Sequence, residues 1–383
     1  MKPSDKPKCP NFSSGPTKKI PGWNVEKISK KYLGRSHRAL DIKPLIKNSI
    51  DRMKKILLLP TDYKIGIVPG SNTGAFEMAM WMVLGERGVD ILVWEAFGKE
   101  WLEDIKNQLT LSDYRVFESD WGKIPELSEV NCNRDVIFTY NGTTSGVRVE
   151  NLDWVPSERK GLIITDATSA CFAMEIDWKK IDIATFSWQK SLGGEGGHGV
   201  IILSPRAVER LENYSPRWPI PKIFRLTKNG KLINSIFEGN TINTPSMLCI
   251  NDLANSLDWV ESIGGLKTLI QRSKDNLQTV IDFIEKNSWI ELLCDSKKNI
   301  SSTSICMKFV DERVTSLNDD DQRSFSKDIV NLLSEEQVAF DIESYRSAPP
   351  GLRIWGGPTV ETSDISILLK WIEWAYNEVM GKK

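Results

Sequence analysis

The sequence has few of the residues that build metal centres. Among its 383 residues there are only two histidines, His37 and His198. The six cysteines lie far apart, and none of them shows a CxxC or CxxxH spacing. This pattern excludes a thiolate zinc site and a multi-histidine site, and it gives little support to a disulfide framework. We therefore expect a protein that works without a metal ion.

Long apolar runs and an excess of one charge are also missing. No stretch approaches the roughly 18–20 apolar residues of a transmembrane helix, so no membrane association is expected. Residues 1–12 are polar and contain several prolines, unlike a secretory signal, and we expect a cytoplasmic protein. The 50 Lys and Arg residues balance 51 Asp and Glu residues, which argues against a nucleic-acid partner.

Strands and helices alternate through the first two thirds of the chain. Near-continuous apolar runs such as 161–164 indicate strands buried on both faces, as in a mostly parallel sheet covered by helices. The sequence therefore predicts an α/β fold with a seven-stranded sheet. The expected strands are 64–70, 89–95, 113–119, 135–142, 161–168, 182–189 and 198–204.

The texture changes near residue 251, where a smaller α+β unit is expected. We predict a large domain over 18–262 and a small domain over 263–383, with an N-terminal arm, 1–17, packing on the small domain. The acidic run 319–321 is expected to be a solvated loop. The expected helices are 251–263, 265–287, 324–337 and 362–380, and the expected strands are 289–295, 303–310, 338–342 and 351–357.

Three features of the large domain point to chemistry. The segment IVPGSNTGAF predicts a strand, a tight turn and a helix start whose N–H groups and partial positive charge suit a phosphate. Asp166 ends an apolar strand, where open α/β sheets place ligand contacts. Lys190 ends a β-rich run before a glycine cluster, which lets the backbone approach a ligand. Taken singly, the first two features also fit an ordinary helix cap and a polar strand end.

Together these features match the requirements of pyridoxal phosphate. A lysine amine forms a Schiff base with its aldehyde, and a carboxylate keeps the pyridine nitrogen protonated so that the ring accepts electrons. One crossover separates Asp166 from Lys190, so both side chains are expected at one crevice, with the helix start taking the phosphate.

The segments FSSGPT, GRSHR, GSNTGAFEMAMW, TYNGTTSGV, IITDATSA, SWQKSLGG, NTPS and PPGLRIWGGPT occur in this order. They resemble motifs of the phosphoserine aminotransferase family, and the resemblance covers essentially the whole chain. This family belongs to the class V aminotransferases of fold type I. The resemblance implies a homodimer with shared active sites, in which Lys190 is the Schiff-base lysine and Asp166 pairs with the pyridine nitrogen. The other cofactor contacts that it implies are Asn72, Thr73, Phe97, Thr143 and Gln189, with Asn243 and Thr244 supplied by the other subunit.

Two positions depart from the family pattern. The residue that stacks on the cofactor ring, a Trp in many members, corresponds to Phe97, and the flanking Trp94 and Trp101 are alternative stackers. The phosphate turn reads Ser-Asn-Thr and lacks the arginine of some relatives. Both departures concern cofactor contacts and leave the chemistry in place.

The resemblance implies L-glutamate and 3-phosphohydroxypyruvate as substrates, with O-phospho-L-serine and 2-oxoglutarate as products of a ping-pong reaction in serine biosynthesis. The family is also linked to pyridoxine synthesis. Arg353 is expected to bind the α-carboxylate, because its planar fork donates two parallel hydrogen bonds. His37 and Arg38 are expected at the distal phosphate or γ-carboxylate, with Arg346 and Arg35 as further candidates.

Two alternatives remain open. Another class V enzyme, such as an alanine–glyoxylate aminotransferase, fits the fold, whereas a cysteine desulfurase is disfavoured because Gln189 rather than His precedes Lys190. A non-catalytic ligand sensor on the same fold carries an N-terminal DNA-binding module, which this sequence does not show. His198, after the glycine cluster, is expected to be structural, because the freed Lys190 amine can itself carry protons.

Overall fold

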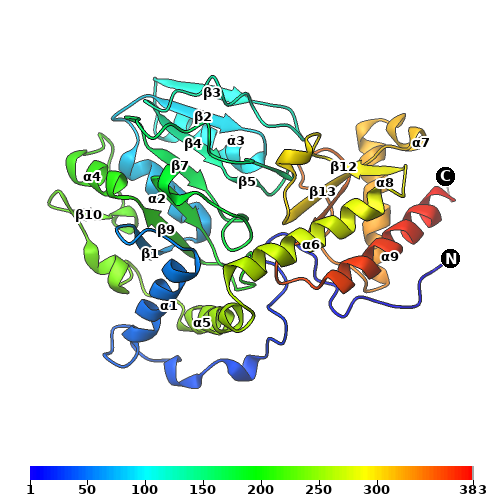
Figure 1. The fold of residues 1–383 in the computed structure, drawn as a ribbon, viewed down its shortest axis with the longest axis horizontal. Coiled ribbons are helices and arrows are strands. Elements are labelled where there is room, and N and C mark those ends of the chain that lie inside the picture. Colours follow the sequence, from blue (N-terminus) through cyan, green and yellow to red (C-terminus); the bar gives the residue numbers. More distant parts are fainter. Residues whose placement is uncertain (382–383) are drawn as a thin grey trace.

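A seven-stranded sheet forms the centre of the computed structural model, which describes residues 1–381 (Figure 1). The strand order is β1-β9-β8-β7-β4-β2-β3. Strand β9 runs antiparallel to both of its neighbours, and every other pair in the sheet is parallel. The predicted mostly parallel sheet is confirmed. Its strands are β1 (Lys64–Pro69), β2 (Val89–Val93), β3 (Tyr114–Glu118), β4 (Asp135–Thr139), β7 (Ile163–Asp166), β8 (Ile183–Phe186) and β9 (His198–Leu203).

Helices cover both faces of this sheet. Successive residues of β2 belong to different apolar clusters: Leu92 packs with residues of α1 and α5, while Ile91 and Val93 pack with residues of α2 and α3. Because neighbouring strand residues point to opposite faces, the sheet is the middle of three layers. The covering helices are α1 (Lys43–Ile56) and α5 (Met247–Ser262) on one face, and α2 (Ser71–Val83), α3 (Ala96–Glu103) and α4 (Pro205–Asn213) on the other.

The start of α2 lies unusually close to the sheet. Gly70, at the N-cap, has a left-handed φ of 84°, so the chain turns sharply from β1 into the helix. A Cβ atom on Gly199 of β9 would lie 2.2 Å from the carbonyl oxygen of Ser71, so only glycine allows this contact. The two glycines therefore seat the first turn of α2 against the edge where β1 ends.

A second apolar core lies at the end of the molecule that carries both termini (Figure 1). It includes Phe12 of the N-terminal segment, whose backbone oxygen accepts the N–H of Trp355. The indole of Trp371 donates to the Asp5 carbonyl at 2.6 Å. These contacts attach Asp5 and Phe12 to the C-terminal unit; the packing of the whole arm 1–17 and the division at residue 262 stay predictions. The unit contains α6 (Leu266–Ile284), α7 (Glu312–Thr315), α8 (Asp319–Glu335), α9 (Thr362–Met380), β12 (Ile290–Leu292), β13 (Ser304–Phe309) and β14 (Leu352–Trp355).

Two local predictions in this unit are wrong. The acidic run 319–321 forms the first turn of α8, because Asn318 caps the helix by accepting the Asp321 N–H at 3.0 Å and acidic side chains favour a helix N-terminus. Residues 338–342 form no strand, and within this range only Phe340 makes an isolated bridge, which pairs it with Asn11. Left-handed φ values at Gln337 and Asp341 interrupt the extended run.

Among residues 1–381, no helix is long and apolar enough to cross a membrane.

Short elements complete the described chain. The two-stranded pairs are β5 (Asn141–Gly142) with β6 (Val147–Arg148) and β10 (Thr227–Lys228) with β11 (Lys231–Leu232). The single turns are η1 (Val25–Lys27), η2 (Lys30–Tyr32), η3 (Asp104–Gln108), η4 (Trp178–Lys180), η5 (Lys222–Phe224), η6 (Asn234–Glu238) and η7 (Lys297–Asn299).

Candidate active site

A cavity of about 170 Å³ opens where the carboxyl ends of the parallel strands meet. Asp166 is the last residue of β7, and Lys190 follows shortly after β8. The first turn of α2 follows β1, Phe97 follows β2, and Thr143 follows β4. Five strand ends therefore converge, as expected for a ligand site in an open α/β sheet.

The cavity brings together most of the predicted site residues of a single chain. Ser14, Gly15, Ser71, Trp101, Thr139, Thr168 and Tyr345 also line it, beside the predicted Asn72, Thr73, Phe97, Thr143, Asp166, Gln189, Lys190 and Arg353. Six other predicted residues do not line it, namely Arg35, His37, Arg38, Asn243, Thr244 and Arg346.

Lys190 is buried at the floor of this cavity. Its amine donates to the Ser14 carbonyl and lies 3.4 Å from the Thr143 hydroxyl. A Cβ atom on Gly15 would lie 3.1 Å from Nζ, so the N-terminal segment passes directly over the amine. Burial and, next, the positive charge of Arg353 lower the Lys190 pKa to about 7, against the opposing effect of Asp166. The amine can therefore lose its proton near neutral pH.

Asp166 is the carboxylate that faces Lys190. It accepts the Thr168 N–H at 3.0 Å and the Thr168 hydroxyl at 2.7 Å, and the Asn72 side chain hydrogen bonds to it as well. Burial raises the pKa of Asp166, while these hydrogen bonds and the charge of Lys190 act in the opposite direction. Because hydrogen-bond donors favour the ionised form of a carboxylate, Asp166 is suited to pair with a ligand atom that carries a proton.

The first turn of α2 provides a place for an anion. Gly70 has no side chain with which to cap the helix, so no side-chain acceptor takes up the first N–H groups of α2. Asn72 lies in this turn, and its Oδ1 atom is buried without a hydrogen-bond partner. Gln189 borders the same cavity from the other side. Free N–H groups and the partial positive charge of a helix start favour a phosphate group.

The opposite wall is aromatic and cationic. The rings of Phe97 and Tyr345 lie 5.8 Å apart, and the Arg353 guanidinium lies 5.7 Å from the Tyr345 ring. The Arg353 Nε atom is buried without a partner, so it can donate to a ligand carboxylate. Trp101 also lines the cavity, whereas Trp94 does not and its indole donates to the Val147 carbonyl. The choice of stacking residue is thereby narrowed to Phe97 and Trp101.

His198 is buried beside the lysine segment and does not line the cavity. Its ring stacks on Trp188 with the centroids 5.1 Å apart, and its Nε2 atom accepts the Ser246 N–H at 3.0 Å. Burial lowers the His198 pKa, which keeps the ring neutral and able to accept this hydrogen bond. These contacts favour the structural role that the sequence suggested.

Several cavity residues were missed by the sequence reasoning. Ser14 and Gly15 belong to the FSSGPT segment and Thr168 to IITDATSA, so both motifs contained the signal. Tyr345 precedes a candidate arginine, Arg346, and has no local pattern of its own. Thr139 lies at the end of β4 and could have been found by the same strand-end rule that selected Asp166.

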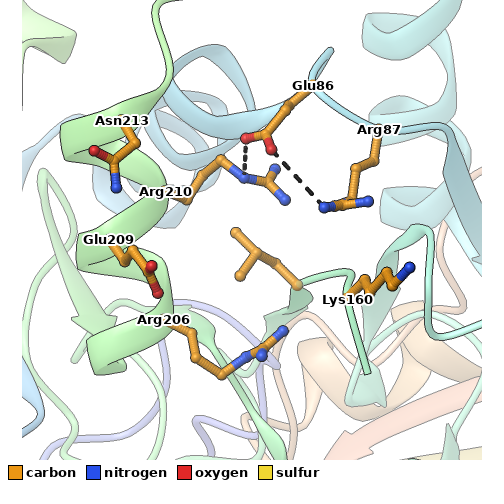
Figure 2. A pocket seen from close by; sticks show the side chains of 8 residues that line it. Glu86, Arg87, Lys160, Arg206, Glu209, Arg210 and Asn213 are labelled. Atoms are coloured by element: carbon orange, nitrogen blue, oxygen red, sulfur yellow. Dashed lines mark ion pairs between the residues drawn. The ribbon is translucent and has the colours of Figure 1, made fainter. Parts of the chain in front are cut away.

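A second hollow, of about 220 Å³, lies at the opposite edge of the sheet and is rich in charge (Figure 2). Arg210 pairs with the buried Asp135 at 2.9 Å and with Glu86 at 2.5 Å, and Arg206 pairs with Asp182 at 3.1 Å. These two arginines are thus already paired, and we assign this hollow a structural role. Among residues 1–381, no group of His, Cys, Asp and Glu side chains is placed to hold a metal ion.

Comparisons with known proteins place this chain in a family. Residues 127–340 match the family model of the class-V aminotransferases. The structure of a phosphoserine aminotransferase from Cytophaga hutchinsonii superposes with a TM-score of 0.78, covering 95% of this chain and 98% of that one at 20% identity. The enzyme from Bacillus circulans subsp. alkalophilus gives a TM-score of 0.78, covering 97% and 99% at 20% identity. The fold is that of the class V aminotransferases, and the family model assigns the chain to this class.

Closer relatives define the family within this class. The phosphoserine aminotransferase of Methanosarcina mazei is 55% identical over 379 residues, which is 99% of this chain and 100% of the relative. That of Methanosarcina barkeri is 55% identical over 381 residues, with the same coverage. The chain belongs to the phosphoserine aminotransferase family.

Pyridoxal phosphate is the cofactor of this class of aminotransferase, and the cavity residues fit it. Lys190 offers a buried amine whose pKa lies near neutrality, for the aldehyde. Asp166 offers a hydrogen-bonded carboxylate for the ring nitrogen, and the first turn of α2 offers N–H groups for the phosphate. The unpartnered Arg353 Nε–H is a buried donor that a substrate carboxylate would satisfy.

Proposed function

We propose that this chain catalyses transamination between L-glutamate and 3-phosphohydroxypyruvate, giving 2-oxoglutarate and O-phospho-L-serine by a ping-pong reaction. The observation that carries the proposal is the buried pair of Lys190 and Asp166 in one cavity with Arg353. As a step of serine biosynthesis, the reaction is proposed to take place in the cytoplasm.

Bound pyridoxal phosphate supplies an electron sink when the Cα–H bond of the substrate breaks. The Lys190 amine is the group that would take this proton from Cα, since its lowered pKa leaves about half of the amines neutral at pH 7. Asp166 holds the proton of the ring nitrogen. Phe97, or Trp101 in its place, would cover the ring, and Thr143 would face the ring hydroxyl.

Arg353 orients the substrate by its α-carboxylate. Its unpartnered Nε atom and the rest of the guanidinium offer two parallel donors beside Lys190. Asn72, Thr73 and Gln189 hold the cofactor phosphate together with the backbone of α2. This arrangement keeps the reacting Cα near the amine that moves its proton.

We infer further that the active unit is a homodimer that shares each site. In the part of the chain that the structure describes, the cavity lining contains two cationic side chains, Lys190 and Arg353. Of these two, Lys190 is proposed to bind the cofactor, which leaves Arg353 for a substrate that carries two anionic groups. A second cation therefore has to come from outside the cavity. The exposed Arg38 and the buried His37 beside it are the proposed source.

The placement of two outlying segments supports sharing. Asn243 and Thr244 are exposed and precede α5, and the segment containing η2 packs on α5 through a hydrogen bond from Asn251 to the Ser29 carbonyl. His37 follows η2 by a few residues. Both segments therefore border the same helix, where a second copy of the chain can receive them.

The reaction is tested by offering glutamate with phosphohydroxypyruvate, glyoxylate or pyruvate in a coupled assay. Preference for phosphohydroxypyruvate supports the proposal, and preference for glyoxylate or pyruvate would assign a different class V activity. Borohydride reduction should fix the cofactor covalently on Lys190, and Lys190→Ala should lose this label. A label on another lysine would contradict the assignment.

Sharing is tested by mixing two inactive variants. A Lys190→Ala subunit combined with an Asn243→Ala/Thr244→Ala subunit should regain partial activity, because one of the two sites in the mixed dimer is intact. Proven mixed dimers without activity would refute sharing.

Arg38→Ala should lower kcat/KM for phosphohydroxypyruvate by roughly 10- to 150-fold, as expected for a lost charge-assisted hydrogen bond. It should lower kcat/KM for glutamate by a smaller factor.

A further inference from the structure

Glu95 is a buried carboxyl group beside the cavity to which the reaction gives no role. It follows β2 at the same sheet edge as Asp166 and is only 1% exposed. Its hydrogen-bond donors are neutral groups from three segments of the chain. Burying a carboxylate among neutral groups costs free energy, so we expect Glu95 to have a function besides packing.

The first contact of Glu95 is with α3. It is the N-cap of this helix, and its Oε1 atom accepts the Gly98 N–H at 2.8 Å. Capping alone needs only a short polar side chain such as Ser, Thr, Asp or Asn. The first turn of α3 carries Phe97, which lines the cavity. Glu95 therefore fixes the wall that carries Phe97.

The second contact is with the loop after β4. The Thr144 hydroxyl donates to Glu95 Oε2 at 2.8 Å and itself accepts the Ala96 N–H at 3.0 Å. The Thr139 hydroxyl lies 3.3 Å from Oε1. Thr143, adjacent to Thr144, faces the Lys190 amine. One carboxyl group thus joins the segment that bears Phe97 to the segment that bears Thr143.

The charge of Glu95 also reaches Lys190. Burial raises the Glu95 pKa to about 7, with a further contribution from the charge of Asp166. In its ionised form it raises the Lys190 pKa, as Asp166 on β7 does, while Arg353 on β14 lowers it. Cys306 on β13 is the other titratable group that feels Glu95, and burial keeps its thiol protonated by raising its pKa to about 12.

We propose that Glu95 is a positioning residue of the cofactor site, which fastens the Thr143 loop to the start of α3 and acts through its charge on the Lys190 amine. The inference rests on the proposed function, since it assumes that Lys190 receives the cofactor. A helix cap without a role at the site would affect only stability.

The test compares Glu95→Gln with Thr144→Val and with Glu103→Gln, an exposed glutamate on the same helix. Each variant is freed of cofactor and titrated with pyridoxal phosphate, and the loading rate is followed by absorbance from pH 5.5 to 9. Glu95→Gln should move the pH midpoint of loading downward, because Lys190 loses a neighbouring negative charge. Thr144→Val should raise the cofactor Kd roughly tenfold, as for one lost hydrogen bond. It should also move the midpoint downward, because the hydrogen bond from Thr144 lowers the Glu95 pKa and thereby favours the negative charge that acts on Lys190. Glu103→Gln should match the wild type in both readouts.

The outcomes distinguish the proposed function from the proposed role of Glu95. A wild type that does not load at Lys190 would refute the proposed function itself. A wild type that loads, with Glu95→Gln folded and showing the wild-type midpoint, would overturn the action of Glu95 on the amine. If Glu95→Gln does not fold, Thr144→Val decides the positioning role: an unchanged Kd would overturn it, and a raised Kd would support it.

Discussion

The low pKa of the Lys190 amine gives the site a measurable property before any substrate is present. Burial and the charge of Arg353 lower this pKa to about 7, from an ordinary value of 10.5. At pH 7 about half of the Lys190 amines are neutral, whereas an ordinary lysine is neutral in roughly one molecule in 3,000. Because the neutral amine is the nucleophile, the cavity increases the reactive fraction by about a thousandfold.

The assay mixes cofactor-free protein with pyridoxal phosphate and follows the absorbance change by stopped flow. We expect the second-order rate constant of loading to rise with pH, with a midpoint near 7, and then to level off. Below this pH most Lys190 amines are protonated and unreactive, and above it most are neutral. The same cofactor mixed with a free alkylamine gives the profile of an ordinary amine, whose midpoint lies near 10.

Arg353→Met tests the cause of the shift. Removing this positive charge should move the midpoint upward, because the charge of Arg353 is the largest effect after burial that lowers the Lys190 pKa. Arg87→Met, in the hollow at the opposite edge of the sheet, removes the same charge and should leave the midpoint unchanged. A wild-type midpoint near 10, or an Arg353→Met profile identical to the wild type, would refute the reasoning.

Two further predictions concern stability. Burial lowers the pKa of His198 below 6.5, so the unfolded chain binds this proton at a higher pH than the folded chain. Stability should therefore fall as the pH drops below about 6.5. His198→Gln should reduce the loss of Tm between pH 7.5 and 5.5, and an unchanged loss would contradict this role of His198. Arg210→Met should lower the free energy of unfolding by about 3–5 kcal/mol in urea denaturation, because it leaves the buried Asp135 without its cation, and Arg210→Met/Asp135→Asn should recover part of the loss. Equal stability of the single and double variants would refute the pairing argument.

The large sheet could be predicted because its strands carry their own signal. Strands such as Ile163–Asp166 are buried on both faces and read as continuous apolar runs. The strand-end rule then placed Asp166 and the start of α2 at one edge without knowledge of the packing. The lysine needed the glycine cluster beside it as well, because Lys190 comes after its strand has ended.

The small unit was less predictable because distant segments decide its local structure. Residues 338–342 have the composition of a strand, yet Phe340 pairs with the N-terminal segment through the Pro10 carbonyl. The acidic run 319–321 differs, because its signal is local: Asn318 directly precedes it, and an Asn cap followed by acidic residues predicts a helix start. The first of these two misses therefore has a distant cause, and the second was readable from the sequence.

Glu95 shows where the sequence rule was applied too narrowly. It follows the apolar strand Val89–Val93 as directly as Asp166 ends its own strand, so the rule that selected one carboxylate selects the other. What the sequence cannot supply is the difference between their partners. Asp166 faces Thr168 and Lys190 across the cavity, whereas Glu95 turns away toward Thr144 and reaches the amine only through its charge. A carboxylate at a strand end is thus a reason to look for a ligand, and its hydrogen-bond donors decide whether it touches the ligand or holds the residues that do.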